Sequence, residues 1–300
     1  MRNIATLALM LFCVPAARAN CTWNQAPSTV DFGTYSAFTG GNLAATSPFQ
    51  VKCSPNSRGQ VVISAGTPPA SFTPRTLKGP GGRSLPYNLY LDATYTAIWG
   101  DGTGGSVAPA AYSTGRGGGN TYFDGTIYAF LPDGGDVPSG TYIDAVSVDI
   151  VDGQSRDATT LTITLIVARA CTVSAFSIAF GNYDTVGANE ATPLDATAPI
   201  DVRCTAGTTA TVILDAGMHA SGGERRLMSA GGDYLRYNVF MDATRASVWN
   251  DVTVKTGTAV SMNTPVVLNP GGSVLFGRVF AGQDVPAGTY TDTLQATVNY

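Results

Sequence analysis

Two aspartates and a tryptophan stand close together in the sequence and could act on a sugar. Asp92, Trp99 and Asp101 lie in one segment, and paired carboxylates beside an aromatic ring can perform acid–base chemistry on a glycosidic bond. The same residue types recur in the second half of the chain, as Asp242, Trp249 and Asp251. Recurrence in both halves favours a role in the fold, with Asp residues capping turns and Trp residues filling cores. We therefore expect that the protein is not an enzyme.

Other candidate sites lack the partners that their chemistry requires. His219 is the single histidine, and it has no second histidine or free thiol with which to hold zinc or activate a serine. The segment GDGTGG at residues 100–105 resembles part of a calcium loop, but the spaced acidic ligands and the terminal glutamate are missing. The sequence predicts neither a metal nor a cofactor.

The first 19 residues have the pattern of a secretory signal peptide. Arg2 precedes an apolar run over residues 4–14, and a small-x-small cleavage site ends at Ala19. The apolar run is too short to span a bilayer. We expect the mature chain to begin near Asn20 and to pass through an oxidising compartment such as a periplasm.

The composition indicates a weakly charged, all-β protein. The formal net charge is −4 and only 13% of the residues are charged. Nucleic acids and anionic membranes attract basic patches, so we expect no nucleic-acid partner and no membrane insertion. Short apolar-alternating runs separated by turn signals predict β-sandwich domains.

The chain is a tandem duplication. LPYNLYLDATYTAIWGD at residues 85–101 matches LRYNVFMDATRASVWND at residues 235–251, and DVPSGTYID at residues 136–144 matches DVPAGTYTD at residues 284–292. The four cysteines that follow the signal peptide stand at nearly equal spacings in the two halves. We therefore expect one disulfide in each half, formed by Cys21 with Cys53 and by Cys171 with Cys204.

One strand-like segment has no copy elsewhere in the chain. Residues 159–170 read TTLTITLIVARA, and the apolar side chains alternate with others at period two. The apolar positions are Leu161, Ile163, Leu165 and Val167. The polar segment DGQSRDA at residues 152–158 resembles a hairpin turn, so the strand can return along the strand that ends near Val151.

The ordered motifs of both halves resemble the spore coat protein U domain. These motifs are FGxY after the first cysteine, VxC at the second, YNLYLDAxxxxxWGDG, and the closing VPxGTYxDxxxxxV. The family serves as pilin in archaic, Csu-type chaperone–usher pili. The resemblance implies immunoglobulin-like sandwiches that lack the final strand. In the family an extension before the first cysteine of the next subunit fills the gap, and a periplasmic chaperone fills it before assembly.

The resemblance also implies a division of the chain. After the signal peptide at 1–19, it predicts an adhesin domain at 20–158, a donor-like strand at 159–170 that completes this domain, and a pilin domain at 171–300. The second domain then lacks its final strand, and its expected acceptor edge consists of Leu294, Ala296, Val298 and Tyr300. Because Cys21 directly follows the expected mature start, we expect no extension to donate, which suits the pilus tip.

Binding residues are expected where the first domain diverges from the second. The loop TPPASFTP at residues 67–74 replaces GMHASGGE at residues 217–224, and a second divergent stretch covers residues 106–123. Apolar loop residues at one end of a sandwich would form an exposed interaction patch, although they could instead pack under their own loops. The candidates are Pro68, Pro69, Phe72, Pro74, Val107, Pro109 and Tyr112.

These observations together predict a secreted tip adhesin at the cell surface that mediates attachment and biofilm formation. The expected partners are a periplasmic chaperone, an outer-membrane usher, the next pilin subunit and an abiotic or host surface. Two alternatives remain open, namely a lectin-type adhesin that uses Asp, Asn and aromatic residues on a glycan, and a structural secreted coat protein.

Overall fold

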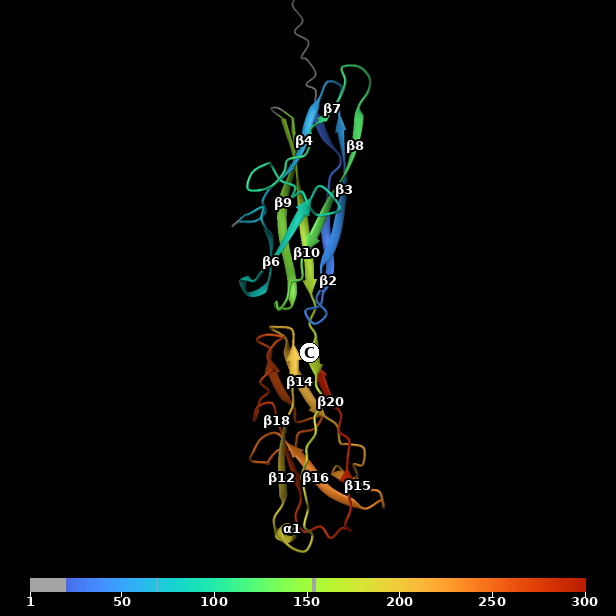
Figure 1. Cartoon of the computed structure of the whole chain (residues 1–300), viewed down its shortest axis with the longest axis vertical. Coiled ribbons are helices and arrows are strands. Elements are labelled where there is room, and N and C mark those ends of the chain that lie inside the picture. Colours follow the sequence, from blue (N-terminus) through green and yellow to red (C-terminus); the bar gives the residue numbers. More distant parts are fainter. Residues whose placement is uncertain (1–19, 69, 153–154) are drawn as a thin grey trace, which may run out of the picture.

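The computed structural model describes residues 20–68, 70–152 and 155–300, which form two β-domains joined end to end (Figure 1). Each domain has its own hydrophobic core. The predicted signal peptide lies outside the described residues. Among the described residues, no helix has the length and apolar character needed to cross a membrane.

The strands of the first domain form two layers around one core. They are β1 (Cys21–Gln25), β2 (Thr29–Tyr35), β3 (Leu43–Cys53), β4 (Arg58–Ile63), β5 (Arg75–Lys78), β6 (Ser84–Tyr90), β7 (Tyr112–Ser113), β8 (Thr121–Leu131), β9 (Gly140–Asp152) and β10 (Ser155–Val167), with a 3-10 turn at Pro80–Gly82. One layer has the order β1-β3-β8-β6, and the other contains β4, β9, β10 and β2. β5 pairs with both β6 and β9 and so connects the layers.

β10 lies between β9 and β2. It is antiparallel to β9, with Leu165 opposite Tyr142, and parallel to β2, with Ile163 opposite Val30. It begins at Ser155, inside the segment 152–158 expected to form a hairpin turn, because the ladder to β9 continues through these polar residues. Its inward side chains are at most 1% exposed, and they are Leu161, Ile163, Leu165 and Val167.

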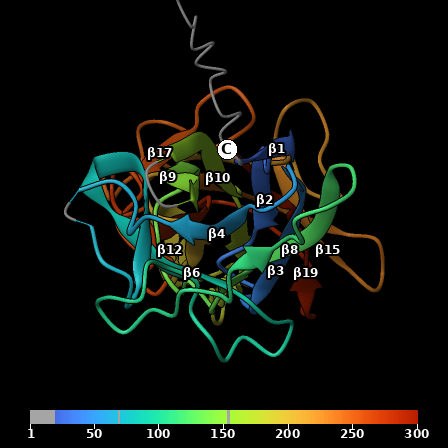
Figure 2. The ribbon, with the colours of Figure 1, turned by 90° about the horizontal axis from the view of Figure 1, so that it is seen from above.

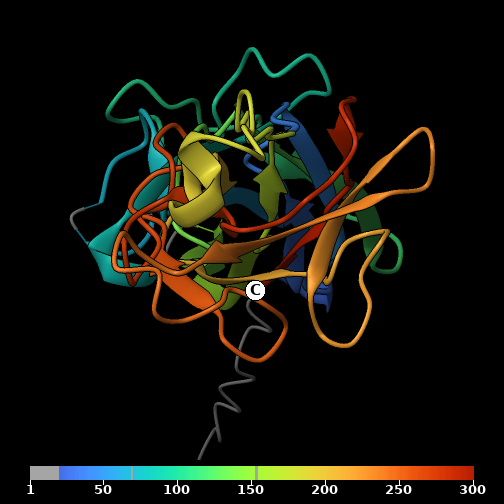
Figure 3. The same ribbon diagram turned by 90° about the horizontal axis from the view of Figure 1, so that it is seen from below.

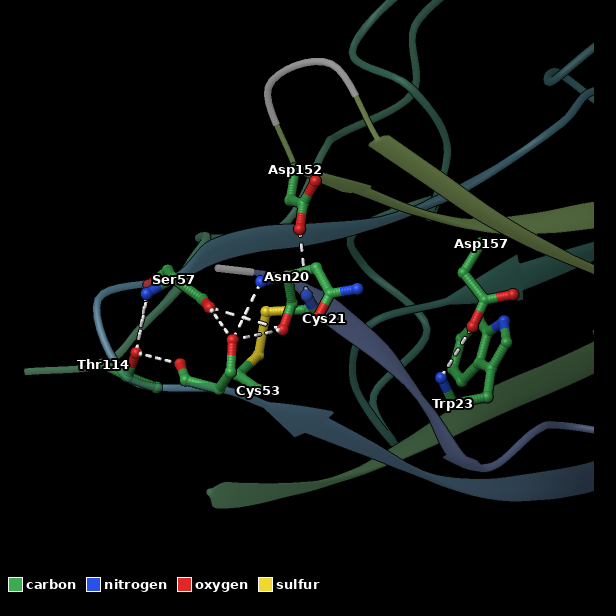
Figure 4. The surroundings of a disulfide bond; sticks show 9 residues. Asn20, Cys21, Trp23, Cys53, Ser57, Thr114, Asp152 and Asp157 are labelled. Atoms are coloured by element: carbon green, nitrogen blue, oxygen red, sulfur yellow. Dashed lines mark hydrogen bonds between the residues drawn. A yellow bond between two sulfur atoms is a disulfide. The ribbon is translucent and has the colours of Figure 1, made fainter. Parts of the chain in front are cut away.

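The disulfides are Cys21–Cys53 and Cys171–Cys204, the pairs expected from the repeat. Figure 4 shows the first one beside the β9–β10 hairpin. The carboxylate of Asp152 accepts the backbone N–H of Cys21 at 2.9 Å, and that of Asp157 accepts the backbone N–H of Trp23 at 2.9 Å. The edge strand β1 is therefore held by the hairpin as well as by β3.

The second domain repeats this arrangement with shorter ladders. Its elements are β11 (Cys171–Val173), α1 (Ala188–Ala191), β12 (Leu194–Pro199), β13 (Val202–Cys204), β14 (Thr209–Leu214), β15 (Arg225–Ser229), β16 (Tyr234–Phe240), β17 (Lys255–Thr258), β18 (Val274–Val279), β19 (Tyr290–Thr291) and β20 (Ala296–Asn299). One sheet has the order β12-β18-β16-β15-β19, another has β17-β14-β20, and β11 pairs with β13.

A buried arginine explains part of the repeated sequence. Arg75 is fully buried and donates to Asn88 Oδ1 at 2.8 Å and to the carbonyl of Trp99 at 2.7 Å. Trp99 is 4% exposed, and its Nε1 donates to the carbonyl of Val61 at 3.0 Å. The second domain contains the same network, built by Arg225, Asn238, Trp249 and Val212. The prediction that both tryptophans fill cores is therefore confirmed.

Shortening a buried side chain of β10 should destabilise the first domain. Leu165→Ala leaves a cavity beneath a fully buried position, so the free energy of unfolding should fall by about 2–5 kcal/mol. Urea denaturation measures this change. Ile166→Ala is the control, because Ile166 points outward and is 51% exposed; its effect should stay within about 0.5 kcal/mol. Equal effects of the two substitutions would contradict the observed register.

Alkaline pH should weaken the first domain through Tyr35. Burial of Tyr35 and the carboxylate of Asp133, which accepts its hydroxyl hydrogen, raise the pKa of Tyr35 to about 12. In the unfolded chain a tyrosine titrates near 10. The unfolded state therefore loses this proton first, so the stabilisation is complete below pH about 10 and declines as the pH rises toward 12.

The pH dependence is measured by urea denaturation between neutral pH and pH about 12. Tyr35→Phe should make the alkaline decline shallower. Tyr122→Phe is the control, because Tyr122 is 50% exposed and should leave the decline as it is. An unchanged slope in Tyr35→Phe would show that this hydroxyl does not carry the effect.

Candidate functional site

An open groove lies in the second domain between residues 176–183 and residues 285–294. Both segments contribute to a cavity of about 690 Å³, which Leu227 also lines. A second cavity of about 240 Å³ shares Ile178 and Phe180 with the first. The two cavities together form a groove that is lined by polar groups and by apolar side chains, among them Ile178, Phe180 and Leu227.

The groove occupies the place that β10 fills in the first domain. The offset that aligns Asp136 with Asp284 also aligns Val30 in β2 with Ile178 and Val146 in β9 with Leu294. Val30 and Val146 are 0% exposed, whereas Ile178 and Leu294 are only half-buried. The difference arises because β10 covers the first pair and no described strand covers the second.

The walls of the groove also lack regular pairing. β9 is a continuous strand of 13 residues, but its counterpart is divided into β19 and β20, with no strand at residues 292–295. Residues 176–183, the counterpart of β2, form no strand. Because β2 pairs in its sheet with β10, loss of that partner removes the ladder on both sides of the groove.

The predicted acceptor residues lie partly along this groove. Leu294 lines it, whereas Ala296 and Val298 lie on β20, which pairs with β14 on one side. Tyr300 is 57% exposed. The prediction omitted the wall at residues 176–183, although the repeated F-G-x-Y motif marks that wall as the counterpart of β2.

A hydrogen-bonded tyrosine and aspartate lie at the groove. Tyr237 Oη donates to Asp292 Oδ2 at 2.7 Å. Burial, together with the carboxylate of Asp292, raises the pKa of Tyr237 well above its usual range, so the hydroxyl remains a donor. In the first domain the equivalent bond from Tyr87 to Asp144 also measures 2.7 Å, and Ile163 of β10 lies opposite Asp144. A strand can therefore cover such a pair.

Phe72 is buried, which corrects the expectation that it belongs to an exposed patch. It is 8% exposed, and the guanidinium of Arg75 lies 5.0 Å from the centre of its ring. The ring fits against Gly100, where a Cβ atom would come within 2.8 Å of it. The sequence could not show this contact because the loop glycines that accommodate the ring are distant in sequence.

The other predicted binding residues do not gather at the far end of the domain. Seen from above, the loop between β4 and β5 projects sideways (Figure 2). Pro68 and Pro74 are exposed, Val107 is 45% exposed, and Pro109 is half-buried. Pro69 lies outside the described residues.

Tyr112 belongs to a different part of the first domain. It is half-buried on β7, and its ring lies 4.7 Å from that of Phe123. β7 pairs with β4 near Arg58, at the disulfide end. The predicted residues are thus divided between the side of the domain that carries the β4–β5 loop and the disulfide end, where β7 lies.

Asp92 and Asp101 cap turns. Asp92 accepts the backbone N–H groups of Thr94 at 2.9 Å and Ala97 at 3.0 Å, and Asp101 accepts that of Thr103 at 2.9 Å. Hydrogen bonds from Thr94 and then Ala97 lower the pKa of Asp92 to about 2. At neutral pH its carboxyl group therefore lacks the proton that a general acid must supply. Within the described ranges, no three His, Cys, Asp or Glu residues are grouped to hold a metal ion.

Sequence comparison identifies the same domain in both halves. The sequence model of the Spore Coat Protein U domain matches residues 6–149 and 157–297. Protein U of Myxococcus xanthus is 34% identical over 130 residues, which cover 40% of this chain and 70% of that protein.

Two solved structures resemble the chain along most of its length. The CsuC-CsuE chaperone-tip adhesion subunit pre-assembly complex of Acinetobacter baumannii is 16% identical, with 94% of this chain and 100% of that chain covered and a TM-score of 0.44. The CupB6 tip adhesin of Pseudomonas aeruginosa is 12% identical, with 93% of each chain covered and a TM-score of 0.41.

Structural similarity with TM-scores below 0.5 assigns no role to the chain. The sequence match, in contrast, covers nearly the whole chain in two copies, and the duplicated fold agrees with it. The chain therefore belongs to the Spore Coat Protein U domain family.

Proposed function

We propose that this chain is the tip adhesin of a chaperone–usher pilus. In this proposal the first domain attaches to a surface, and the second domain joins the fibre by accepting a strand from the next pilin subunit. The observation that carries the proposal is the difference between the two halves. β10 fills the groove of the first domain, while the equivalent groove of the second domain is open.

The open groove has the properties of a strand-binding site. No strand ladder forms over residues 176–183 and 292–295, where the carbonyls of Thr293 and Gln295 accept backbone N–H groups on one side only. Unpaired edges beside apolar side chains readily accept an added strand. β10 shows the pattern that such a strand needs, with four buried side chains at alternate positions. The next pilin subunit supplies the strand in the fibre, and a periplasmic chaperone supplies it until the outer-membrane usher receives the protein.

A synthetic peptide with the sequence of residues 159–170 should bind the second domain. Tyr290, Asp292 and Leu294 repeat the residues Tyr142, Asp144 and Val146 that face β10. The peptide should therefore raise the unfolding temperature of the second domain of the full chain in a dose-dependent way. Differential scanning calorimetry measures this shift.

Two controls test whether the peptide acts through the groove. A peptide with serine at the four apolar positions should produce no shift. In the protein, Leu294→Asp should abolish the response because it places a charge at the groove, whereas Gln295→Asp at the exposed neighbouring position should retain it. A shift that persists in Leu294→Asp would contradict strand acceptance at this site.

The completeness of the first domain supports its adhesive role. Because its groove is filled by β10, it requires no strand from another subunit, and its β4–β5 loop exposes Pro68 and Pro74. The flank that carries the β4–β5 loop and Val107 is the apolar surface that we propose for attachment to abiotic or host material and for biofilm formation. Val107 is 45% exposed.

Attachment to hydrophobic material tests this surface on cells that carry the pilus. Val107→Ser should reduce attachment while the amount of pilus stays unchanged. Val252→Ser is the matched control, because Val252 is 82% exposed but lies in the second domain; it should leave attachment intact. Equal attachment by both variants would contradict a role for this surface. Secretion that is independent of a chaperone would instead support a structural coat protein.

A further inference from the structure

A specific joint connects the two domains. Both carboxylate oxygens of Asp136, in the loop before β9, are used: one accepts the hydroxyl of Ser261 and the other accepts the backbone N–H of Met262 at 3.0 Å. The backbone N–H of Ser139 donates to the carbonyl of Ala206 at 3.1 Å. The loop at residues 136–140 is thus bound to the disulfide end of the second domain.

Apolar contacts and a short connection complete the joint. The side chain of Met262 packs against the core of the first domain, and Val137 is 7% exposed. Only residues 168–170 separate the end of β10 from Cys171. A strand that fills a groove therefore brings the disulfide end of the following domain directly onto the loop beside that groove.

The same loop is repeated at residues 284–288, where Asp284 has no hydrogen-bond partner among the residues that the structure describes. Its sequence is DVPAG in place of DVPSG, and the serine at the differing position contributes only its backbone N–H to the joint. The turn has the same internal bond, since Tyr142 Oη donates to the carbonyl of Pro138 at 2.9 Å and Tyr290 Oη to that of Pro286 at 2.8 Å.

The free loop lies beside the open groove. Val285, Pro286, Ala287 and Gly288 line its larger cavity, and the chain that leads into the loop is bound to α1 by a hydrogen bond from Gly282 N to the carbonyl of Asn189 at 2.9 Å. Figure 3 shows this end of the molecule from below. Asp284 is exposed, whereas Asp136 is partly covered.

We propose that the loop at residues 284–288 docks the disulfide end of the domain that follows the incoming strand. The partner is a domain of the same family that presents a hydroxyl group, an adjacent backbone N–H and an apolar side chain, as Ser261 and Met262 do. Asp284 accepts both hydrogens, and Val285 contributes apolar contact. The inference rests on the proposed function, because the strand brings this partner to the loop.

A three-domain protein tests the docking. The full chain is extended after Tyr300 by a second copy of residues 153–300, so that the added strand follows β20 as β10 follows β9. Pulsed EPR between labels on the second and the added domain should give one narrow distance. Asp284→Ala should lower the ratio of docked to undocked molecules about tenfold or more, because bonds to a charged acceptor are lost. Asp284→Asn, which keeps an acceptor oxygen, should cause a smaller loss.

Matched variants separate the possible results. Asp136→Ala should loosen the existing joint to a similar extent, and Asp251→Ala, at an exposed position elsewhere in the second domain, should leave both joints intact. A narrow distance retained in Asp284→Ala, while the second domain is stabilised by the added strand, would overturn the docking inference alone. If the added strand does not raise the unfolding temperature of the second domain, the proposed function itself fails.

Discussion

The pairing of β10 with both β9 and β2 is the interaction on which the first domain depends. Each backbone N–H and C=O group that is buried in a sandwich needs a partner, and β10 supplies these partners to two strands simultaneously. Its four inward side chains also close the core between them. One strand thus satisfies the polar and the apolar requirements of the same groove.

The second domain shows the consequence of an unfilled groove in a domain built on the same repeated motifs. Its core retains the buried network of arginine, asparagine and tryptophan. The fold as a whole therefore forms without a strand in the groove. The groove walls, however, lose regular strand structure where β10 would lie, although their residues alternate as they do in the first domain. Local sequence preference is therefore insufficient to form these strands without a partner in the ladder.

Much of this architecture could be predicted because the alternation of apolar residues and the repeated motifs are visible in the sequence. The alternation of Leu161, Ile163 and Leu165 predicts a buried strand, and the duplicated motifs predict two similar domains. Contacts between distant loops could not be predicted in the same way. Phe72 is buried because Gly100 leaves room for its ring, and Asp136 is used in the joint because Ser261 faces it from the other domain. Neither contact produces a recognisable pattern in the neighbouring sequence.

Hydrogen–deuterium exchange of the full chain tests the central claim most directly. It compares the backbone amides of residues 144–147 in β9 with those of the equivalent residues 292–295, which form no strand in the second domain. Strand pairing by β10 predicts slow exchange in the first segment and fast exchange in the second, with protection of the second segment when a strand fills its groove. Equal protection of the two segments in the absence of a partner would contradict the account.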